Sequence, residues 1–239
     1  MRPIRRAMAL AAGLGLRLRP ITDSLPKPLV KVGGKAMLDH ALDRLAAAGV
    51  AECVINLHHL GAMIRDHLAT RTQPRIVFSD ETDQLLETGG GVAKALPRLG
   101  PDPFFVVNAD IVWFDGPAGS ALDRLARAWD GARLDALLLL MPRQDAFGYE
   151  GPGDFALDAQ SRPRRRGDAP QAPYVFAGVQ ILAPRLFARA PTGPFSLNLL
   201  YDQALAEERL GAVIHDGRWF HVGTPDALLA ANARLAKPP

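Results

Sequence analysis

The sequence has almost no cysteine. Among its 239 residues only Cys53 is a cysteine, so the chain cannot close a disulfide within itself. Disulfide frameworks are typical of oxidising compartments, and their absence favours a protein of the reducing cytoplasm. Cys53 stands in the apolar run Glu-Cys-Val-Ile-Asn-Leu, which predicts a packed thiol rather than a reactive one.

Long apolar runs and a strong net charge are absent as well. No run approaches the ~20 apolar residues that span a bilayer, and the first apolar segment ends at a glycine turn instead of forming a signal-peptide core. The formal net charge of +3 is too small to indicate nucleic acid. We therefore expect no membrane and no nucleic acid among its partners.

Strand-like and helix-like segments alternate through the first two thirds of the sequence. Apolar runs without polar alternation indicate strands that are buried on both faces. The segments between them repeat apolar residues at helical spacing. This alternation predicts an α/β fold, in which a mostly parallel, Rossmann-like sheet carries helices on both faces. The predicted strands are residues 6–11, 52–57, 75–79, 104–108 and 135–141, and the predicted helices are residues 37–48, 60–69, 91–99 and 120–130.

Glycine and proline become frequent from Gly148 onward. We interpret the chain as a single domain, 1–239, in which residues 1–147 form one half and residues 148–239 form a smaller, substrate-facing half. A basic run, Arg162-Pro-Arg-Arg-Arg166, stands in a polar segment of the second half and is interpreted as a solvated hairpin tip or an anion-binding flap. The predicted strands of this half are residues 154–158, 174–182 and 212–216, and its helices are residues 184–189, 196–208 and 224–236.

The loop after the first strand has the residues of a polyphosphate site. Small residues let backbone N–H groups approach an anion closely. Arg17 can bind phosphate oxygens through two parallel hydrogen bonds, and Lys27 is a compact charge between two prolines. The pattern lacks the lysine of a Walker A loop and the third glycine of a dinucleotide fingerprint. The small residues are Ala11, Ala12, Gly13 and Gly15.

Leu-x-Ala-Gly-x-Gly-x-Arg-Leu-x-Pro-x-Thr followed by Pro-Lys-Pro-Leu resembles the sugar-1-phosphate nucleotidyltransferases, and later segments extend the resemblance over essentially the whole chain. The resemblance implies the nucleotide-diphospho-sugar transferase fold, with a nucleotide-binding first half and a sugar-phosphate-binding second half. It also implies that residues 11–15 bind the nucleotide. Arg17 would contact the leaving phosphates, and Lys27 would contact the phosphates being joined and split.

A carboxylate ends the buried strand Phe104-Phe-Val-Val-Asn-Ala-Asp110. Such a charge must be solvated, paired or bound to a metal, and it could also cap the following turn. The resemblance makes Asp110 the metal-binding aspartate, with Ala109 in place of the usual glycine. Asp110 would then hold Mg²⁺ between the α-phosphate and the incoming sugar phosphate, and Mg²⁺ commonly combines one or two carboxylates with phosphate oxygens and water.

Two further groups of residues are assigned to substrates. The segment Leu86-Glu-Thr-Gly-Gly-Gly91 precedes a predicted helix, and the resemblance makes it the loop that reads the base; Thr88 could also cap that helix. In the second half, Asp154 and Asn198 could hydrogen-bond sugar hydroxyls or an N-acetyl group, or lie on the surface. The predicted base contacts are Thr88, Gly89 and Gly90, and the predicted sugar-phosphate contacts are Asp154, Gly178 and Asn198.

His221 is where the sequence departs from the family pattern. It stands in Gly217-Arg-Trp-Phe-His-Val-Gly-Thr-Pro225, where relatives carry a second metal-binding aspartate. Imidazole binds Mn²⁺, Co²⁺ or Zn²⁺ well and Mg²⁺ poorly. Three interpretations remain open: His221 is a direct metal ligand, it holds a metal-bound water or a phosphate oxygen, or it is structural. The expected cofactor is Mg²⁺, with Mn²⁺ or Co²⁺ as alternatives.

The resemblance implies an enzyme that makes an NDP-sugar and pyrophosphate from an NTP and a sugar-1-phosphate. The wording Leu-Glu-Thr-Gly-Gly-Gly resembles most closely the N-acetylmuramate-1-phosphate uridylyltransferases of peptidoglycan recycling. This subgroup implies UTP and N-acetylmuramate α-1-phosphate as substrates and UDP-N-acetylmuramate as product. The alternatives are a mannose- or heptose-1-phosphate guanylyltransferase and an inactive, nucleotide-sugar-binding regulatory subunit. We expect a monomer or a weak dimer.

Overall fold

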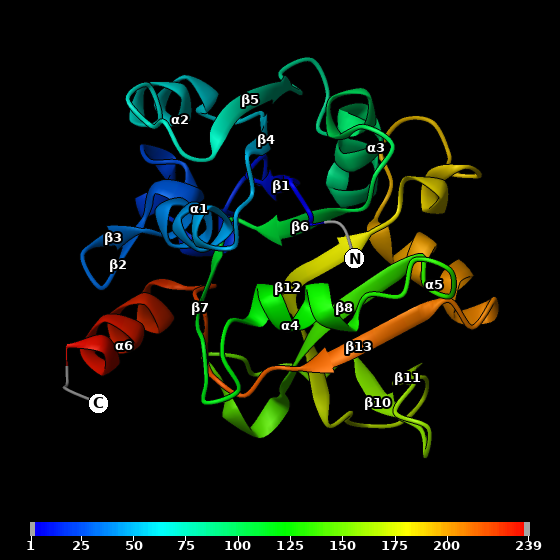
Figure 1. Ribbon diagram of the computed structural model, residues 1–239. Coiled ribbons are helices and arrows are strands. Elements are labelled where there is room, and N and C mark those ends of the chain that lie inside the picture. Colours follow the sequence, from blue (N-terminus) through cyan, green and yellow to red (C-terminus); the bar gives the residue numbers. More distant parts are fainter. Residues whose placement is uncertain (1–2, 237–239) are drawn as a thin grey trace.

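The computed structural model describes residues 3–236, and within them nine strands form one mixed sheet (Figure 1). In chain order these are β1 (Arg6–Leu10), β4 (Glu52–Leu57), β5 (Arg75–Asp80), β6 (Phe104–Asn108), β8 (Ala136–Pro142), β10 (Phe155–Leu157), β11 (Pro163–Arg165), β12 (Tyr174–Leu182) and β13 (Leu210–Ile214). β5, β4, β1 and β6 are neighbouring parallel strands. β12 pairs antiparallel with β6 on one side and with β8 on the other, so both predicted halves share this sheet.

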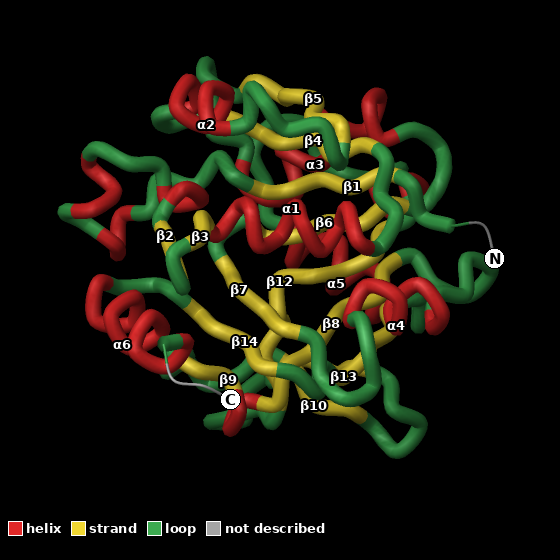
Figure 2. The backbone as a smooth tube through the Cα atoms, turned by 60° about the vertical axis from the view of Figure 1, so that its left-hand side comes forward, coloured by secondary structure: helices red, strands yellow, loops and turns green. Residues whose placement is uncertain are grey.

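Helices cover both faces of the sheet (Figure 2). They are α1 (Met37–Ala47), α2 (Gly61–His67), α3 (Glu87–Leu99), α4 (Ala121–Ala128), α5 (Leu197–Ala206) and α6 (Pro225–Leu235). Strand side chains alternate between faces: Ala7 and Ala9 belong to the same core cluster as residues of α1, α2 and α4, whereas Met8 belongs to the cluster that contains residues of α3 and α5. The predicted α/β fold with helices on both faces is confirmed.

The sequence patterns do not predict a second, smaller sheet. It consists of β7 (Ile111–Phe114), β9 (Ala146–Phe147) and β14 (Arg218–His221), in the order β7-β14-β9. In its register His221 pairs with Ile111, the residue that follows Asp110. The indole Nε1 of Trp219 donates a hydrogen bond of 2.9 Å to the carbonyl oxygen of Ala177 on β12. The small sheet therefore carries His221 to the carboxyl end of β6.

Three predicted segments differ from the structure. The helix predicted at residues 91–99 begins at Glu87, so the three glycines 89–91 are buried residues of its first turns. The helix predicted at residues 184–189 is a single 3₁₀ turn, Pro184–Phe187. Part of the basic run forms β11 rather than a hairpin tip, and β11 pairs antiparallel with β10. A short hairpin of β2 (Lys31–Val32) and β3 (Lys35–Ala36) is also unpredicted.

The structure bears on the single cysteine and on the short apolar runs of the sequence. Cys53 is buried on β4, and burial raises the pKa of its thiol to about 12, so the thiol is packed and protonated. None of the helices between residues 3 and 236 has the length and apolar character needed to cross a membrane.

Candidate active site

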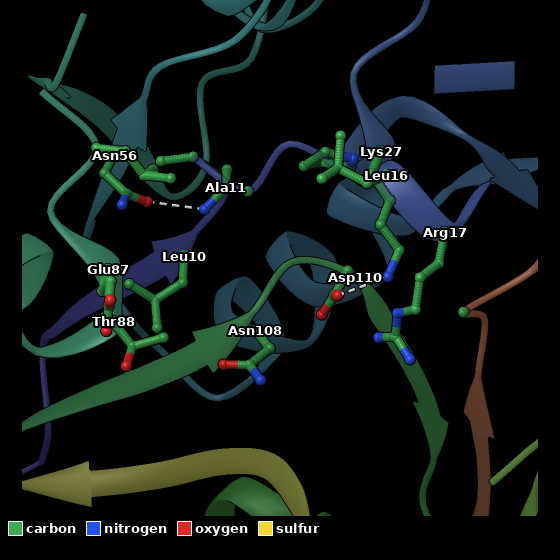
Figure 3. Close-up of a pocket in the computed structure, with 16 residues that line it drawn as sticks. Leu10, Ala11, Leu16, Arg17, Lys27, Asn56, Glu87, Thr88, Asn108 and Asp110 are labelled. Carbon is green, nitrogen blue, oxygen red and sulfur yellow. Dashed lines mark hydrogen bonds and ion pairs between the residues drawn. The ribbon is translucent and has the colours of Figure 1, made fainter. Parts of the chain in front are cut away.

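A cavity of about 470 Å³ opens where β1 and β6 end (Figure 3). Ligands of open α/β sheets bind outside the carboxyl ends of the strands, which is where this cavity lies. Its walls come from the loop after β1, from the start of α3 and from the end of β6. The predicted site residues that line it are Ala11, Ala12, Gly13, Gly15, Arg17, Lys27, Thr88 and Asp110.

A second cavity of about 310 Å³ adjoins the first. The two cavities share Arg17, Asn108 and Asp110 in their walls. Residues of both predicted halves therefore meet at a common junction. The predicted residues that line the second cavity are Arg17, Asp110, Asp154, Gly178, Asn198 and His221.

An ion pair between Lys27 and Asp110 lies at this junction. Lys27 Nζ donates to Asp110 Oδ2 at 2.7 Å, and the two side chains are 9% and 37% exposed. Burial opposes ionisation of Asp110, but the charge and the hydrogen bond of the Lys27 ammonium outweigh it and lower the pKa of this carboxyl. Asp110 is therefore an anion at neutral pH. Figure 3 shows the Arg17 side chain pointing toward this pair.

The packing of the glycine loop determines where Lys27 stands. Pro26 is extended, and Lys27–Leu29 form a 3₁₀ turn in which the Val30 amide donates to the Lys27 carbonyl oxygen. Gly15 has a φ of +66°, and a Cβ there would lie 3.1 Å from the Lys27 Cβ. Only glycine adopts this conformation without strain. Gly15 therefore permits close packing against Lys27, in addition to lining the cavity.

A buried polar network supports the same loop, and the sequence patterns do not predict it. The Ala11 amide donates to Asn56 Oδ1 at 2.7 Å, so this amide is already paired within the protein. Asn56 Nδ2 donates to Glu81 Oε1 at 2.9 Å, and Glu81 Oε2 accepts from the Leu86 amide at 3.3 Å. Glu81 thus links the loop after β1 to the segment that begins α3. A buried Asn and Glu at strand ends are the signal that could have revealed it.

The three predicted base contacts have different environments. Thr88 lines the larger cavity, and its hydroxyl accepts a hydrogen bond of 2.9 Å from the Leu197 amide. Gly89 and Gly90 are buried, and both amides donate to the Phe195 carbonyl oxygen. A Cβ on Gly89 would overlap the Phe195 ring. These two glycines allow the close approach of α3 to the segment before α5, and of the three predicted base contacts only Thr88 lines the larger cavity.

His221 and Asp110 both line the smaller cavity. Its ring stacks on Trp219 with centroids 6.0 Å apart and meets Tyr149 edge-on at 6.1 Å. Burial and then the Lys27 ammonium lower the pKa of His221, although Asp110 opposes them. The imidazole is therefore neutral at neutral pH, which is the form that can bind a metal or accept a hydrogen bond.

Comparisons with known proteins agree with this geometry. The family model described as nucleotidyl transferase matches residues 6–151. An N-acetylmuramate alpha-1-phosphate uridylyltransferase from Caulobacter vibrioides is 46% identical over 97% of this chain and 97% of its own length. A protein of the same name from Neisseria meningitidis serogroup B is 36% identical over 95% of this chain and 97% of its own length.

More distant similarities extend the comparison. A mannose-1-phosphate guanylyltransferase catalytic subunit beta from Drosophila pseudoobscura pseudoobscura is 28% identical over 94% of this chain and 60% of its own length. Among solved structures, a putative glucose-1-phosphate thymidylyltransferase from Bacillus anthracis superposes with a TM-score of 0.80 at 18% identity. That superposition covers 98% of this chain and 96% of the other, and it supports the fold alone.

We predict that the buried Glu81 carboxyl makes stability depend on pH. Burial raises its pKa above the ordinary 4.5, while hydrogen bonds from Asn56 and Leu86 lower it. Between the unfolded and the raised folded pKa the folded state binds more protons, so the stability from Glu81 declines as pH rises. As pH rises above the ordinary pKa of 4.5, the wild-type protein should lose unfolding free energy relative to Glu81→Gln, as measured by urea denaturation.

The exposed Glu150→Gln variant controls for the removal of a carboxylate charge. The prediction is contradicted if the unfolding free energy of the wild type, relative to that of Glu81→Gln, stays constant or increases as pH rises.

Proposed function

The chain belongs to the nucleotidyl transferase family, and from this premise we propose that it transfers UMP from UTP to N-acetylmuramate α-1-phosphate, releasing pyrophosphate. The product is UDP-N-acetylmuramate. The names of the relatives at 46% and 36% identity support the choice of substrates. The observation that carries the proposal is the junction of two cavities at Arg17, Asn108 and Asp110.

A junction of this kind suits a reaction between two phosphorylated substrates. The nucleotide would occupy the larger cavity, between the glycine loop and Thr88. The sugar phosphate would occupy the smaller one, near Asp154, Gly178 and Asn198. Its phosphate oxygen and the α-phosphorus of the nucleotide would then meet beside Arg17 and Lys27. Residues 1–147 would serve the nucleotide and residues 148–239 the sugar phosphate.

The chemistry needs positioning and cations rather than a general base. The second pKa of a phosphomonoester is about 6, so the sugar phosphate is already an ionised nucleophile at neutral pH. Its oxygen forms the new bond to the α-phosphorus while the bond to the pyrophosphate oxygen breaks. The obstacle is the repulsion between two anions, and aligned cationic groups lower it. Arg17 would neutralise the leaving phosphates, and Lys27 would contact the phosphates being joined and split.

Members of this family generally use a divalent metal, and the residues present fit one. Lys27 binds Oδ2 of Asp110, which leaves Oδ1 for a cation, and the neutral His221 offers a nitrogen. Within residues 3–236 no three metal-ligating side chains cluster, so substrate phosphates and water would complete the site. We assign Asp110 and His221 to Mg²⁺, or to Mn²⁺ or Co²⁺. A bound ion would neutralise charge on the phosphates that Arg17 and Lys27 also contact.

A panel of substrates tests the proposal directly. Pyrophosphate release is measured with UTP, GTP, CTP and dTTP, each paired with N-acetylmuramate, N-acetylglucosamine, mannose and heptose 1-phosphates. We expect the highest kcat/KM for UTP with N-acetylmuramate α-1-phosphate. A preference for GTP with mannose or heptose 1-phosphate would contradict the proposal and identify the protein as a guanylyltransferase. Binding of nucleotide sugars without any pyrophosphate release would indicate a regulatory subunit.

We predict that the charges at the junction dominate kcat. Losing one charge contact to a transferring phosphate costs about 3 kcal/mol of the barrier, or roughly a hundredfold in rate. Lys27→Ala and Asp110→Ala should each lower kcat by roughly that factor while the far-ultraviolet circular dichroism stays unchanged. Lys31→Ala, which removes an exposed lysine on β2, is the matched control and should keep kcat. A Lys27→Ala enzyme with wild-type kcat would remove Lys27 from the proposed machinery.

His221 can be tested through its choice of metal. An aspartate suits Mg²⁺ better than an imidazole does. His221→Asp should therefore keep or raise kcat with Mg²⁺ and lower the advantage of Mn²⁺ or Co²⁺ over Mg²⁺, as measured by pyrophosphate release after chelator treatment and metal titration. A large loss of activity with both Mg²⁺ and Mn²⁺ would argue against a ligand role.

A further inference from the structure

We propose that Arg165 binds the carboxylate of an acidic sugar on the wall that β11 and α5 give to the smaller cavity, and so selects N-acetylmuramate over neutral N-acetylglucosamine. The inference rests on the proposed function and adds a carboxylate subsite to it. N-acetylmuramate differs from N-acetylglucosamine only by a lactyl ether at O3 of the ring. That group carries a carboxylate, so a positioned cation is the direct way to distinguish the two sugars.

The structure holds the Arg165 side chain in one place. Its guanidinium lies 4.8 Å from the centroid of the Phe155 ring and 5.9 Å from that of Tyr201. Nε donates to Asp202 Oδ1 at 2.7 Å, and Nη2 donates to Asn198 Oδ1 at 3.0 Å. The side chain is 30% exposed. Nη2 also donates to the Asn198 carbonyl oxygen at 3.2 Å, so stacking and three hydrogen bonds fix a charged group in the cavity wall before any ligand arrives.

The guanidinium keeps donors for a ligand. Among the residues that the structure describes, Nη1 of Arg165 has no hydrogen-bond acceptor. Its ion-pair partner, Asp202, is 59% exposed, so water screens that attraction. A guanidinium binds a carboxylate with short, charge-assisted hydrogen bonds. Arg165 can thus accept a second carboxylate while Asp202 orients it.

Other cationic residues are assigned to the substrate phosphates, so Arg165 is available for a different anion. Arg17 lines both cavities and Lys27 lines the larger one, and both would serve the phosphates. His221 belongs to the proposed metal site. Arg165 is the remaining cation among the residues that line the smaller cavity, and it stands beside Asn198, a proposed sugar contact. Its anionic ligand is therefore part of the sugar rather than the phosphate.

The strand register explains why only this arginine of the basic run reaches the cavity. Successive side chains of a strand point to opposite faces, and Arg165 pairs with Phe155 in the wall. Arg164, its neighbour on β11, instead pairs with Asp158 at 2.9 Å and does not line the cavity. Arg164 therefore offers a matched control with the same charge on the same strand.

Product binding tests the subsite without depending on turnover. Titration calorimetry gives the Kd of UDP-N-acetylmuramate and of UDP-N-acetylglucosamine for the wild type, Arg165→Gln and Arg164→Gln. The wild type should bind UDP-N-acetylmuramate roughly 10- to 100-fold more tightly, the range expected for a charge-assisted hydrogen bond. Arg165→Gln should abolish this preference and keep the Kd of UDP-N-acetylglucosamine. Arg164→Gln should keep both constants.

Three outcomes would overturn the subsite. In the first, the wild type binds both products with equal affinity. In the second, Arg165→Gln loses the same affinity for both products. In the third, Arg164→Gln loses the preference for UDP-N-acetylmuramate. Equal affinities would leave the proposed uridylyl transfer standing, whereas failure to bind either uridine product would end both proposals. If Arg165→Gln does not fold, Arg165→Lys replaces it; this variant keeps the charge but not the forked geometry, and it should show a smaller loss of preference.

Discussion

The ion pair between Lys27 and Asp110 is the interaction on which the rest of the site depends. A nearly buried ammonium needs a partner, and at 2.7 Å the Asp110 carboxylate satisfies it. The same contact keeps Asp110 ionised and fastens the glycine loop to the end of β6. Because each charge offsets the other, the junction of the cavities neither repels an incoming polyphosphate as strongly as a lone carboxylate nor traps it as a lone lysine would.

The small sheet of β7, β14 and β9 places His221 in the wall of the smaller cavity, next to this junction. β14 pairs with β7 so that His221 stands opposite Ile111, and Trp219 ties the strand to β12 by a hydrogen bond to Ala177. A shift of one residue in this pairing would move His221 to the opposite face, since side chains alternate along a strand. The position of His221 beside Asp110 is therefore determined by strand register over a separation of more than a hundred residues, and local sequence has little influence on it.

Sequence patterns predicted the parts of the fold that local periodicity controls. The strands at residues 52–57, 104–108 and 174–182 match the structure, because long apolar runs need burial on both faces. The patterns missed β7, β9 and β14, whose pairing is non-local and whose strands are short. They also missed the link from Asn56 to Glu81, since a buried polar pair leaves no periodic signal. The sequence could not show that the glycines at 89 and 90 pack against the segment around Phe195, because close packing and contact with a ligand require the same small residue.

The fold also separates the proposed transfer chemistry from the proposed recognition of the sugar. Arg17, Lys27 and Asp110 lie in the loops that follow β1 and β6, which are neighbouring parallel strands in the middle of the main sheet. Arg165 stands on β11 at the edge, and β10 joins the main sheet through a single register pair, Phe155 with Tyr174. The Asp154 amide also donates to the Tyr174 carbonyl oxygen, and Arg165 donates to Asp202 and Asn198 on α5, so these bonds of the hairpin go to β12 and α5 and not to the loop that carries Arg17 and Lys27. Sugar preference can therefore change on this hairpin while the phosphate-binding junction stays intact.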